Sequence, residues 1–453
     1  MCSTQAASVQ QAAAAVNAAR HCRHARSVII AALLRPAPDR LSESILLLHD
    51  PYAPFRHRDY RLFIAMVLIA SLCQQSVGVA VGWDIYERTN SPMALAWIGL
   101  AQFIPVLLFF LPAGQLADRY DRRRIVSISL LIWVGASALL VWTSAQALPV
   151  LGIYASIALA GMATILNRAG RDALLTQLVP AEHLAQAVMW NSTVFQTASV
   201  AGPALAGLLI ALGGSALTVY AFNLGGMLVA LLLSLWFPQR AAQGGKRPST
   251  LRDVFGGLAH VWNTKIVLGL MTIDLFAVLL GGATALLPVY AKDILQVGPA
   301  GLGWLSAAPA MGAVLMAVGI ARGWRKPFPH AGRAFLWAVG VFGVATIVFG
   351  LSRWYWLSLA MLIVLGAADN VGAVIRQTAV QLYTPDQLRG RVSAVNRVFI
   401  SSSNELGAVE SGLLAGLTNP VFAVVAGGVA VLGIAACGFR LFPDLKRLKT
   451  VGG

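Results

Sequence analysis

Twelve mostly apolar segments, each about long enough to cross a lipid bilayer, run through this chain between residues 62 and 442. A membrane helix needs about 20 such residues, and a helix satisfies its backbone hydrogen bonds internally. Only 11% of the residues are charged, against roughly 25% in soluble domains. We therefore predict an all-α polytopic membrane protein. The predicted spans are 62–86, 94–115, 125–145, 148–168, 185–211, 216–237, 266–290, 301–321, 333–352, 354–375, 393–415 and 418–442.

The positive charge of the chain is distributed unevenly across these spans. The net charge is +16, yet only Arg88, Lys292 and Arg353 fall in loops on one side, and the other 31 of 34 Lys and Arg residues fall on the opposite side. Loops rich in Lys and Arg stay in the cytoplasm. The distribution predicts a multi-pass membrane protein with both termini cytoplasmic, and it argues against nucleic acid as a partner.

The longest interior polar segment divides the spans six and six. Pro238, Gly244, Gly245 and Pro248 mark a linker, and helical spacing of the apolar residues after it predicts an amphipathic helix. The predicted domains are a disordered cytoplasmic extension without an assigned function (1–54), a first six-helix half (55–237), the cytoplasmic linker with its helix (238–265), a second six-helix half (266–442) and a cytoplasmic tail (443–453).

An internal repeat supports this division. Matching residues recur 205 positions apart in the fourth and fifth spans and in the tenth and eleventh. Two halves related by an axis along the membrane normal produce such a repeat. It also identifies 393–415 as a span, although the first half of that segment is polar. The matching pairs are Arg171 with Arg376, Pro180 with Pro385, Asn191 with Asn396, Gly202 with Gly407 and Gly207 with Gly412.

A charge-dense turn connects the second and third spans. Gly114 and Asp118 share a helix face, and Arg119, Arg122 and Arg123 follow within a few residues. One interpretation is a topology anchor. The other is a conformational latch in which the carboxylate pairs with an arginine or with a helix N-terminus of the other half. Because Arg391 and Arg397 flank the start of the eleventh span, we expect Asp118 to meet that start when the cytoplasmic side closes.

The turn resembles the loop signature of the major facilitator superfamily. That signature usually has Gly where this chain has Asp121, but the enterobactin-exporter-like branch commonly reads Ala-Asp-Arg-x-Asp-Arg-Arg, as residues 117–123 do. Residues 388–392 fit that branch before the eleventh span. The resemblance covers roughly residues 55–440. It implies twelve helices in two pseudo-symmetric six-helix bundles and a transport function.

A proline interrupts the fifth span at Pro203, which removes a backbone donor and kinks the helix. Gly202 and Gly207 flank it and permit close packing. The segment is either a generic packing kink or, by resemblance, the motif of drug:proton antiporters, with Ala206 in place of one glycine. The resemblance implies outward export.

Carboxylates inside spans are costly and are therefore candidates for function. Asp274, Asp369, Glu405 and Glu410 are candidates for proton coupling, because a shielded carboxylate can alternate between protonated and ionised forms. An internal ion pair is the other interpretation, and for Asp369 the partner would be Arg376. Asp84 is interpreted as a solvated residue at the extracellular mouth.

The candidates for the substrate cavity are the aromatic Trp190, for aromatic or amphiphilic cargo, and the polar side chains of Gln74, Gln75 and Asn191. Hydrogen bonds between helices are an equally common use of such residues. In the fourth span, Arg168 and Asp172 are spaced for an i,i+4 pair.

Nothing in the sequence indicates an enzyme. It contains no phosphate-binding Gly-Lys-Ser/Thr loop, no metal-ligand spacing and no nucleophile elbow, so we expect no metal and no cofactor. We predict a monomeric, proton-coupled exporter that moves a small amphiphile, of the siderophore or drug class, by alternating access. Importer, lipid flippase and non-transporting sensor remain as alternatives.

Overall fold

The structure is a computed structural model, and it describes residues 50–237, 251–323, 330–442 and 445. The described residues from Pro54 onward belong to one compact unit. Most of the predicted extension (1–54) and tail (443–453), and the first part of the predicted linker (238–250), lie outside the described residues. Side chains are described at these positions except at 110–111, 117–119, 251–255, 323 and 439.

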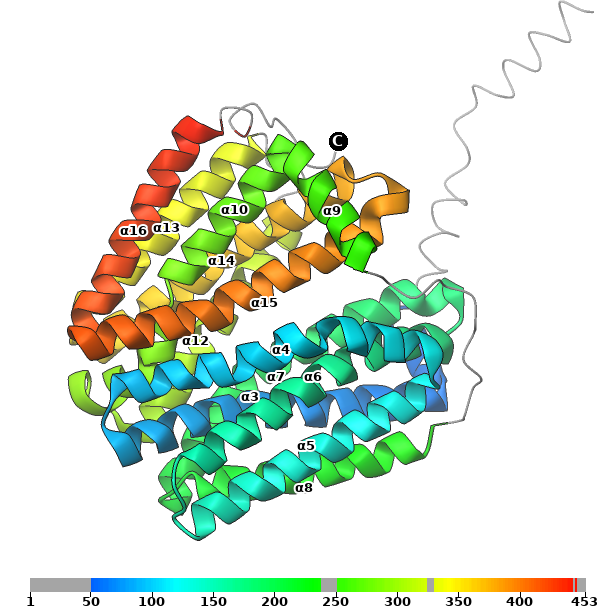
Figure 1. Ribbon diagram of the computed structural model, residues 1–453, viewed down its shortest axis with the longest axis horizontal. Helices are drawn as coiled ribbons and strands as arrows, with labels where there is room; N and C mark the ends of the chain where they lie inside the picture. Colours follow the sequence, from blue (N-terminus) through cyan, green and yellow to red (C-terminus); the bar gives the residue numbers. More distant parts are fainter. Residues whose placement is uncertain (1–49, 238–250, 324–329, 443–444, 446–453) are drawn as a thin grey trace, which may run out of the picture. The chain divides into compact units, whose positions relative to one another are not determined.

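The described residues are helical and contain no strand (Figure 1). The first half consists of α3 (Arg58–Thr89), α4 (Pro92–Arg119), α5 (Arg122–Ala145), α6 (Leu151–Leu178), α7 (Leu184–Gly213) and α8 (Leu217–Leu235), with short turns η1 (Ala53–Arg56) and η2 (Ala181–His183). The second half consists of α10 (Lys265–Leu280), η3 (Ala283–Leu286), α11 (Leu287–Val289), η4 (Tyr290–Ile294), α12 (Gly298–Gly323), α13 (Ala331–Leu351), α14 (Tyr355–Tyr383), α15 (Asp386–Leu417) and α16 (Pro420–Leu441). Helix α9 (Leu251–Asn263) precedes the second half.

Eleven helical segments of the described chain are long and apolar enough to cross a membrane. The twelfth is α15, which is 32 residues long but has a polar first half. In sequence order the membrane helices are α3 to α8, the broken helix that begins as α10, and α12 to α16. The protein is thus an all-α polytopic membrane protein with twelve spans, as predicted.

The two halves repeat one packing pattern. In the first half α3 contacts α7 and α8, α4 contacts α6, and α5 contacts α6 and α8. In the second half α10 contacts α15 and α16, α12 contacts α14, and α13 contacts α14 and α16. Between the halves α7 packs against α12, and α4 runs alongside α15 (Figure 1). The internal repeat matches α7 with α15 and α4 with α12, so the contact of α7 with α12 corresponds to the contact of α15 with α4. This correspondence confirms two pseudo-symmetric bundles.

The seventh span differs from the predicted continuous helix over 266–290. Helix α10 ends at Leu280, and the chain then passes through η3 and α11 into η4, a π-helical turn. Two consecutive glycines, Gly281 and Gly282, occupy the break, and glycine is a poor helix former. A Cβ at Gly282 would lie 2.6 Å from the Gly407 carbonyl oxygen of α15. The break therefore lets α15 approach α10 closely.

The amphipathic helix α9 packs against the start of α15. Val261 is buried in a cluster with Val392 and Val395 of α15 and with Val267 of α10. The polypeptide at Gly257 approaches the backbone of Arg391 so closely that a Cβ there would lie 2.9 Å from the Arg391 carbonyl oxygen. Helix α9 thereby fixes the segment of α15 that carries the predicted latch arginines.

Candidate functional site

The two ends of the bundle are named here by their loops. The arginine-rich end has the loops at 120–121, 179–183 and 384–385, and the arginine-poor end has the loops at 90–91, 146–150, 214–216, 295–297, 352–354 and 418–419. Charge distribution predicts that the arginine-rich end is cytoplasmic.

The halves approach each other closely at the arginine-poor end. A Cβ at Gly207 of α7 would lie 2.8 Å from the Cα of Gly303 on α12. On the other side, a Cβ at Gly412 of α15 would lie 2.8 Å from the backbone nitrogen of Ala96 on α4. Backbones this close leave no room for side chains. The bundle is therefore closed at this end.

Polar contacts join the halves at the same end. The Tyr86 hydroxyl of α3 donates to the Asp293 carboxylate of η4. Lys292 donates to Asn90 Oδ1 at 2.8 Å and also lies 5.5 Å from the centre of the Tyr86 ring. The π-helical turn brings Lys292 and Asp293 to α3, and such turns recur at functional sites. We call these four residues, Tyr86, Asn90, Lys292 and Asp293, the clasp. Sequence reasoning missed it, because its only signal was a lysine at an end of the bundle that has few basic residues.

The predicted antiporter motif lies where α7 meets one helix from each half. Pro203 is inside α7, and the Gly202 carbonyl oxygen accepts a hydrogen bond of 2.8 Å from Ser76 of α3. Five residues on, Gly207 faces Gly303 of α12. The contact of Gly303 with α7 was not predicted, although Gly301 and Gly303 form a pair of small residues in the sequence of the eighth span.

The predicted latch residues have several different partners. Arg122 Nη1 donates to the Ala173 carbonyl oxygen of α6 at 3.1 Å, and Arg123 donates to the Leu235 carbonyl oxygen at the end of α8. Both arginines thus bind backbone carbonyls in their own half, and Leu235 is the last residue of α8, where a cation is favoured. Asp121 caps α5 by accepting from the Arg123 backbone N–H at 3.0 Å, which explains an acid where the superfamily signature has glycine.

The remaining latch residues are on α4 and α15. Gly114 is on α4 and half-buried. The side chains of Asp118 and Arg119 lie outside the described residues. Arg397 Nη1 is 3.5 Å from Asp172 Oδ2 of α6, so it contacts the other half through a carboxylate that was not assigned to the latch. We expected Asp172 to pair with Arg168, but its ion-pair partner is Arg397.

One of the buried carboxylates is in an ion pair. Arg376 of α14 pairs with Asp274 of α10, and both side chains are buried. The alternative pairing of Arg376 with Asp369 is wrong in this conformation. Seven residues separate the two along α14, which is about 10.5 Å of helix rise, whereas Asp274 reaches Arg376 from a neighbouring helix.

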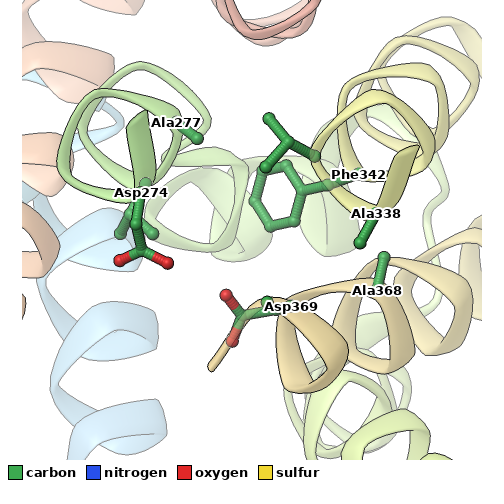
Figure 2. A pocket seen from close by; sticks show the side chains of 9 residues that line it. Asp274, Ala277, Ala338, Phe342, Ala368 and Asp369 are labelled. Atoms are coloured by element: carbon green, nitrogen blue, oxygen red, sulfur yellow. The ribbon is translucent and has the colours of Figure 1, made fainter. Parts of the chain in front are cut away.

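Asp274 and Asp369 line one pocket between α10, α13 and α14, together with Phe342 and small residues such as Ala338 and Ala368. Figure 2 shows both carboxyl groups in the space between α10 and α14. Within the described residues Asp369 has no ion-pair or hydrogen-bond partner. Glu405 and Glu410 are half-buried on α15, away from this pocket, and Glu410 accepts a hydrogen bond of 3.3 Å from Ser411.

The candidate cavity residues are partly used for packing. Gln75 Nε2 donates to Ser199 Oγ at 2.7 Å, which joins α3 to α7. Trp190 packs edge-to-face on Phe55 with ring centroids 5.1 Å apart. Asn191 keeps a buried Oδ1 without a hydrogen-bond partner, and Gln74 is half-buried on α3.

The interpretation of Asp84 as a solvated mouth residue is wrong. Only 6% of Asp84 is exposed. Its carboxylate accepts from Arg88 Nε at 2.7 Å and from the Tyr220 hydroxyl at 3.1 Å. Tyr220 is on α8, which packs against α3, and this contact removes Asp84 from water.

Comparison with known proteins agrees with this architecture. A sequence model of the transmembrane secretion effector family, MFS_3, matches residues 49–449. The chain belongs to this major facilitator family. The enterobactin exporter EntS of Escherichia coli O1:K1 is 25% identical over 402 residues, which cover 87% of this chain and 94% of the relative. The enterobactin exporter EntS of Shigella boydii serotype 18 is equally similar, with the same coverage.

Solved structures of major facilitator transporters share the fold. A bacterial homologue of the human lysosomal transporter Spinster, in an inward-facing conformation, superposes with a TM-score of 0.66 at 16% identity and covers 86% of this chain and 98% of that one. A peptide transporter POT in complex with sulfate superposes with a TM-score of 0.69 at 12% identity, with coverage of 87% and 96%. The protein is thus a multi-pass transporter of small molecules and not an enzyme.

Proposed function

We propose that this major facilitator protein is a proton-coupled exporter of a small amphiphilic molecule, of the siderophore or drug class, in the bacterial inner membrane. Its curated relatives are named enterobactin exporters, which supports export over import or lipid flipping. Both termini are cytoplasmic in this proposal, as the charge distribution predicts, and the protein works as a monomer.

The pocket shared by Asp274 and Asp369 carries the proposal of proton coupling. Asp274 has Arg376 as counter-ion, whereas Asp369 has no ion-pair partner within the described residues. A lone carboxylate deep in a membrane protein is costly when ionised. Asp369 is therefore the group that takes up and releases a proton, and Asp274 with Arg376 supplies a fixed, neutral neighbour. Glu405 and Glu410 remain further candidates on α15.

Alternating access follows from the two types of contact between the halves. The arginine-poor end is closed by helix backbones at Gly207 and Gly303 and by the clasp. The arginine-rich end has the exposed pair of Asp172 with Arg397. Weak exposed pairs contribute little to stability. In this proposal the conformation that is closed at the arginine-poor end receives cargo from the cytoplasm. The clasp then opens and releases the cargo at the arginine-poor end.

Inverted membrane vesicles test the proposal. Vesicles from an efflux-deficient host that contains the protein are energised to make the lumen acidic, and uptake of fluorescent amphiphiles is measured. The proposal predicts accumulation that collapses when an uncoupler removes the pH gradient. Accumulation that is unaffected by the uncoupler would contradict proton coupling. Saturable binding without accumulation would favour the sensor alternative.

A further inference from the structure

Two arginines that match in the internal repeat have different surroundings. Arg376 of α14 is buried and paired with Asp274. Arg171 of α6 occupies the matching position 205 residues earlier. Its Nε is buried without a hydrogen-bond partner, as is that of Arg376, and an unpartnered buried donor costs free energy. The difference is the ion pair: within the described part of the chain Arg171 has no ion-pair partner, so the first half maintains a cation that the second half neutralises.

The sequence of α3 shows why the counter-ion is missing. Asp274 is on α10, and its counterpart in the repeat is α3, where Ile69 occupies the position at the same offset. Helix α3 has carboxylates at Asp59, Asp84 and Glu87 and none between Asp59 and Asp84. Helix α3 therefore lacks a counterpart of Asp274 even if the alignment of the two helices is shifted by a few residues.

The charges around Arg171 add to the excess. Arg168 and Asp172, on the same helix, both interact electrostatically with Arg171. Asp172 is shared with Arg397 of the other half at 3.5 Å. Arg171 thus interacts with one carboxylate and one guanidinium group of its own helix, and that carboxylate also contacts Arg397. Arg168 and Arg397 are exposed, so this group of charged residues is open to a ligand, and it includes residues of both halves.

We infer that Arg171, with Arg168 and Arg397 beside it, binds an anionic group of the cargo, so that the exported molecules are anionic amphiphiles. Guanidinium groups recognise carboxylate, sulfonate and phosphate oxygens through paired N–H donors. The bound anion supplies the counter-charge that Asp274 supplies to Arg376. This inference rests on the proposed exporter function and names the chemical class of its substrate.

A pair of probes that differ in charge tests the inference. The purified protein in nanodiscs of zwitterionic lipid is titrated with 1-anilinonaphthalene-8-sulfonate and with its uncharged analogue N-phenyl-1-naphthylamine, and the signal of empty nanodiscs is subtracted. Arg171→Gln is expected to weaken binding of the sulfonate about tenfold or more, since charge-assisted hydrogen bonds are lost. Binding of the uncharged probe is expected to stay within about twofold.

Two further variants control for folding and for general charge. Arg171→Lys keeps the charge but loses the paired donors, so its affinity for the sulfonate should be intermediate. Arg353→Gln removes an exposed arginine at the arginine-poor end and should change neither affinity. Gel filtration of each variant reports folding. High salt should weaken binding of the sulfonate in the wild type.

Sulfonate affinity that is no higher in the wild type than in Arg171→Gln would overturn the inference, as would an equal loss for both probes. Vesicle transport separates this failure from failure of the proposed function. Uncoupler-sensitive export of the uncharged probe, without preference for the sulfonate, would overturn the inference alone. Accumulation of neither probe, together with equal affinities in the wild type and in Arg171→Gln, would overturn both.

Discussion

Arg376 on α14 is ion-paired with Asp274 on α10, and both side chains are buried. The pair joins two helices of the second half and borders the pocket that contains Asp369. Two charges that neutralise each other form a constant electrostatic background. A change in protonation at Asp369 is then the only change in charge that the pocket requires.

The first prediction concerns the stability of this pair. Asp274→Asn leaves Arg376 buried without a counter-ion, which should lower the free energy of unfolding by about 3–5 kcal/mol. The double variant Asp274→Asn/Arg376→Gln removes both charges and should lose less. Thermal unfolding in detergent measures the order of stability of the wild type, the single variants and the double variant. Asp386→Asn, which alters an exposed pair with Arg389, should leave the melting temperature unchanged; a double variant less stable than either single one would refute the argument.

The second prediction concerns the contact of α7 with α12. Gly207→Ala places a methyl group against Gly303 and Pro299, so it should prevent closure at the arginine-poor end and reduce transport at least about tenfold. Gly225→Ala on α8 is the matched control, because no atom lies within 4 Å of a Cβ there. Cysteine labelling from the side of the arginine-poor end measures opening. Equal labelling of the two variants would show that close backbone approach is not required.

The third prediction concerns the clasp. Tyr86→Phe removes the hydroxyl that donates to Asp293 and should favour opening of the arginine-poor end. In a double-mutant cycle with Asp293→Asn, spin-label distances across that end should report coupling of about 1–3 kcal/mol, because the acceptor is charged. Tyr154→Phe is the control, since its hydroxyl binds the Ala94 carbonyl oxygen within one half. Additive effects would mean that the contact has no role in closure.

The fourth prediction concerns the latch at the arginine-rich end. Asp118→Asn should slow transport several-fold, while membrane insertion and melting temperature stay near those of the wild type. The reason is that the contact of Asp118 with the start of α15 forms only when the cytoplasmic side closes. Arg397→Gln should give a similar defect. Arg397 contacts Asp172 in the present conformation, so the latch requires Arg397 to exchange this carboxylate for Asp118 when the cytoplasmic side closes. Wild-type transport rates in Asp118→Asn would exclude the latch.

Much of the fold could be predicted from the sequence because membrane spans follow from length and hydropathy. Helix α15 is the instructive case: its polar first half hides it from hydropathy, but the match of Asn396 and Gly407 to Asn191 and Gly202 reveals it. The break in the seventh span at Gly281 and Gly282 was missed, because adjacent glycines within an apolar segment also occur in continuous helices.

Partners across helices were harder to predict than the helices themselves. The sequence marked Asp274 and Asp369 as costly residues, but spacing within one helix offered only Asp369 as an ion-pair partner for Arg376, and the partner is Asp274. Asp84 was predicted to be solvated, because its contact with Tyr220 depends on the packing of α3 on α8 and cannot be read from one helix alone. Long-range side-chain pairing of this kind depends on rotation of each helix about its axis, which spacing within one helix does not reveal.

Asp369→Asn tests the central claim most directly. In proteoliposomes, the variant and the wild type are compared in two assays: accumulation of cargo driven by a pH gradient, and exchange of cargo at equilibrium without a gradient. The account predicts that Asp369→Asn loses gradient-driven accumulation and keeps exchange, because the neutral side chain no longer carries a proton, while Asp386→Asn behaves as the wild type. Gradient-driven accumulation at the wild-type level in Asp369→Asn would contradict the account.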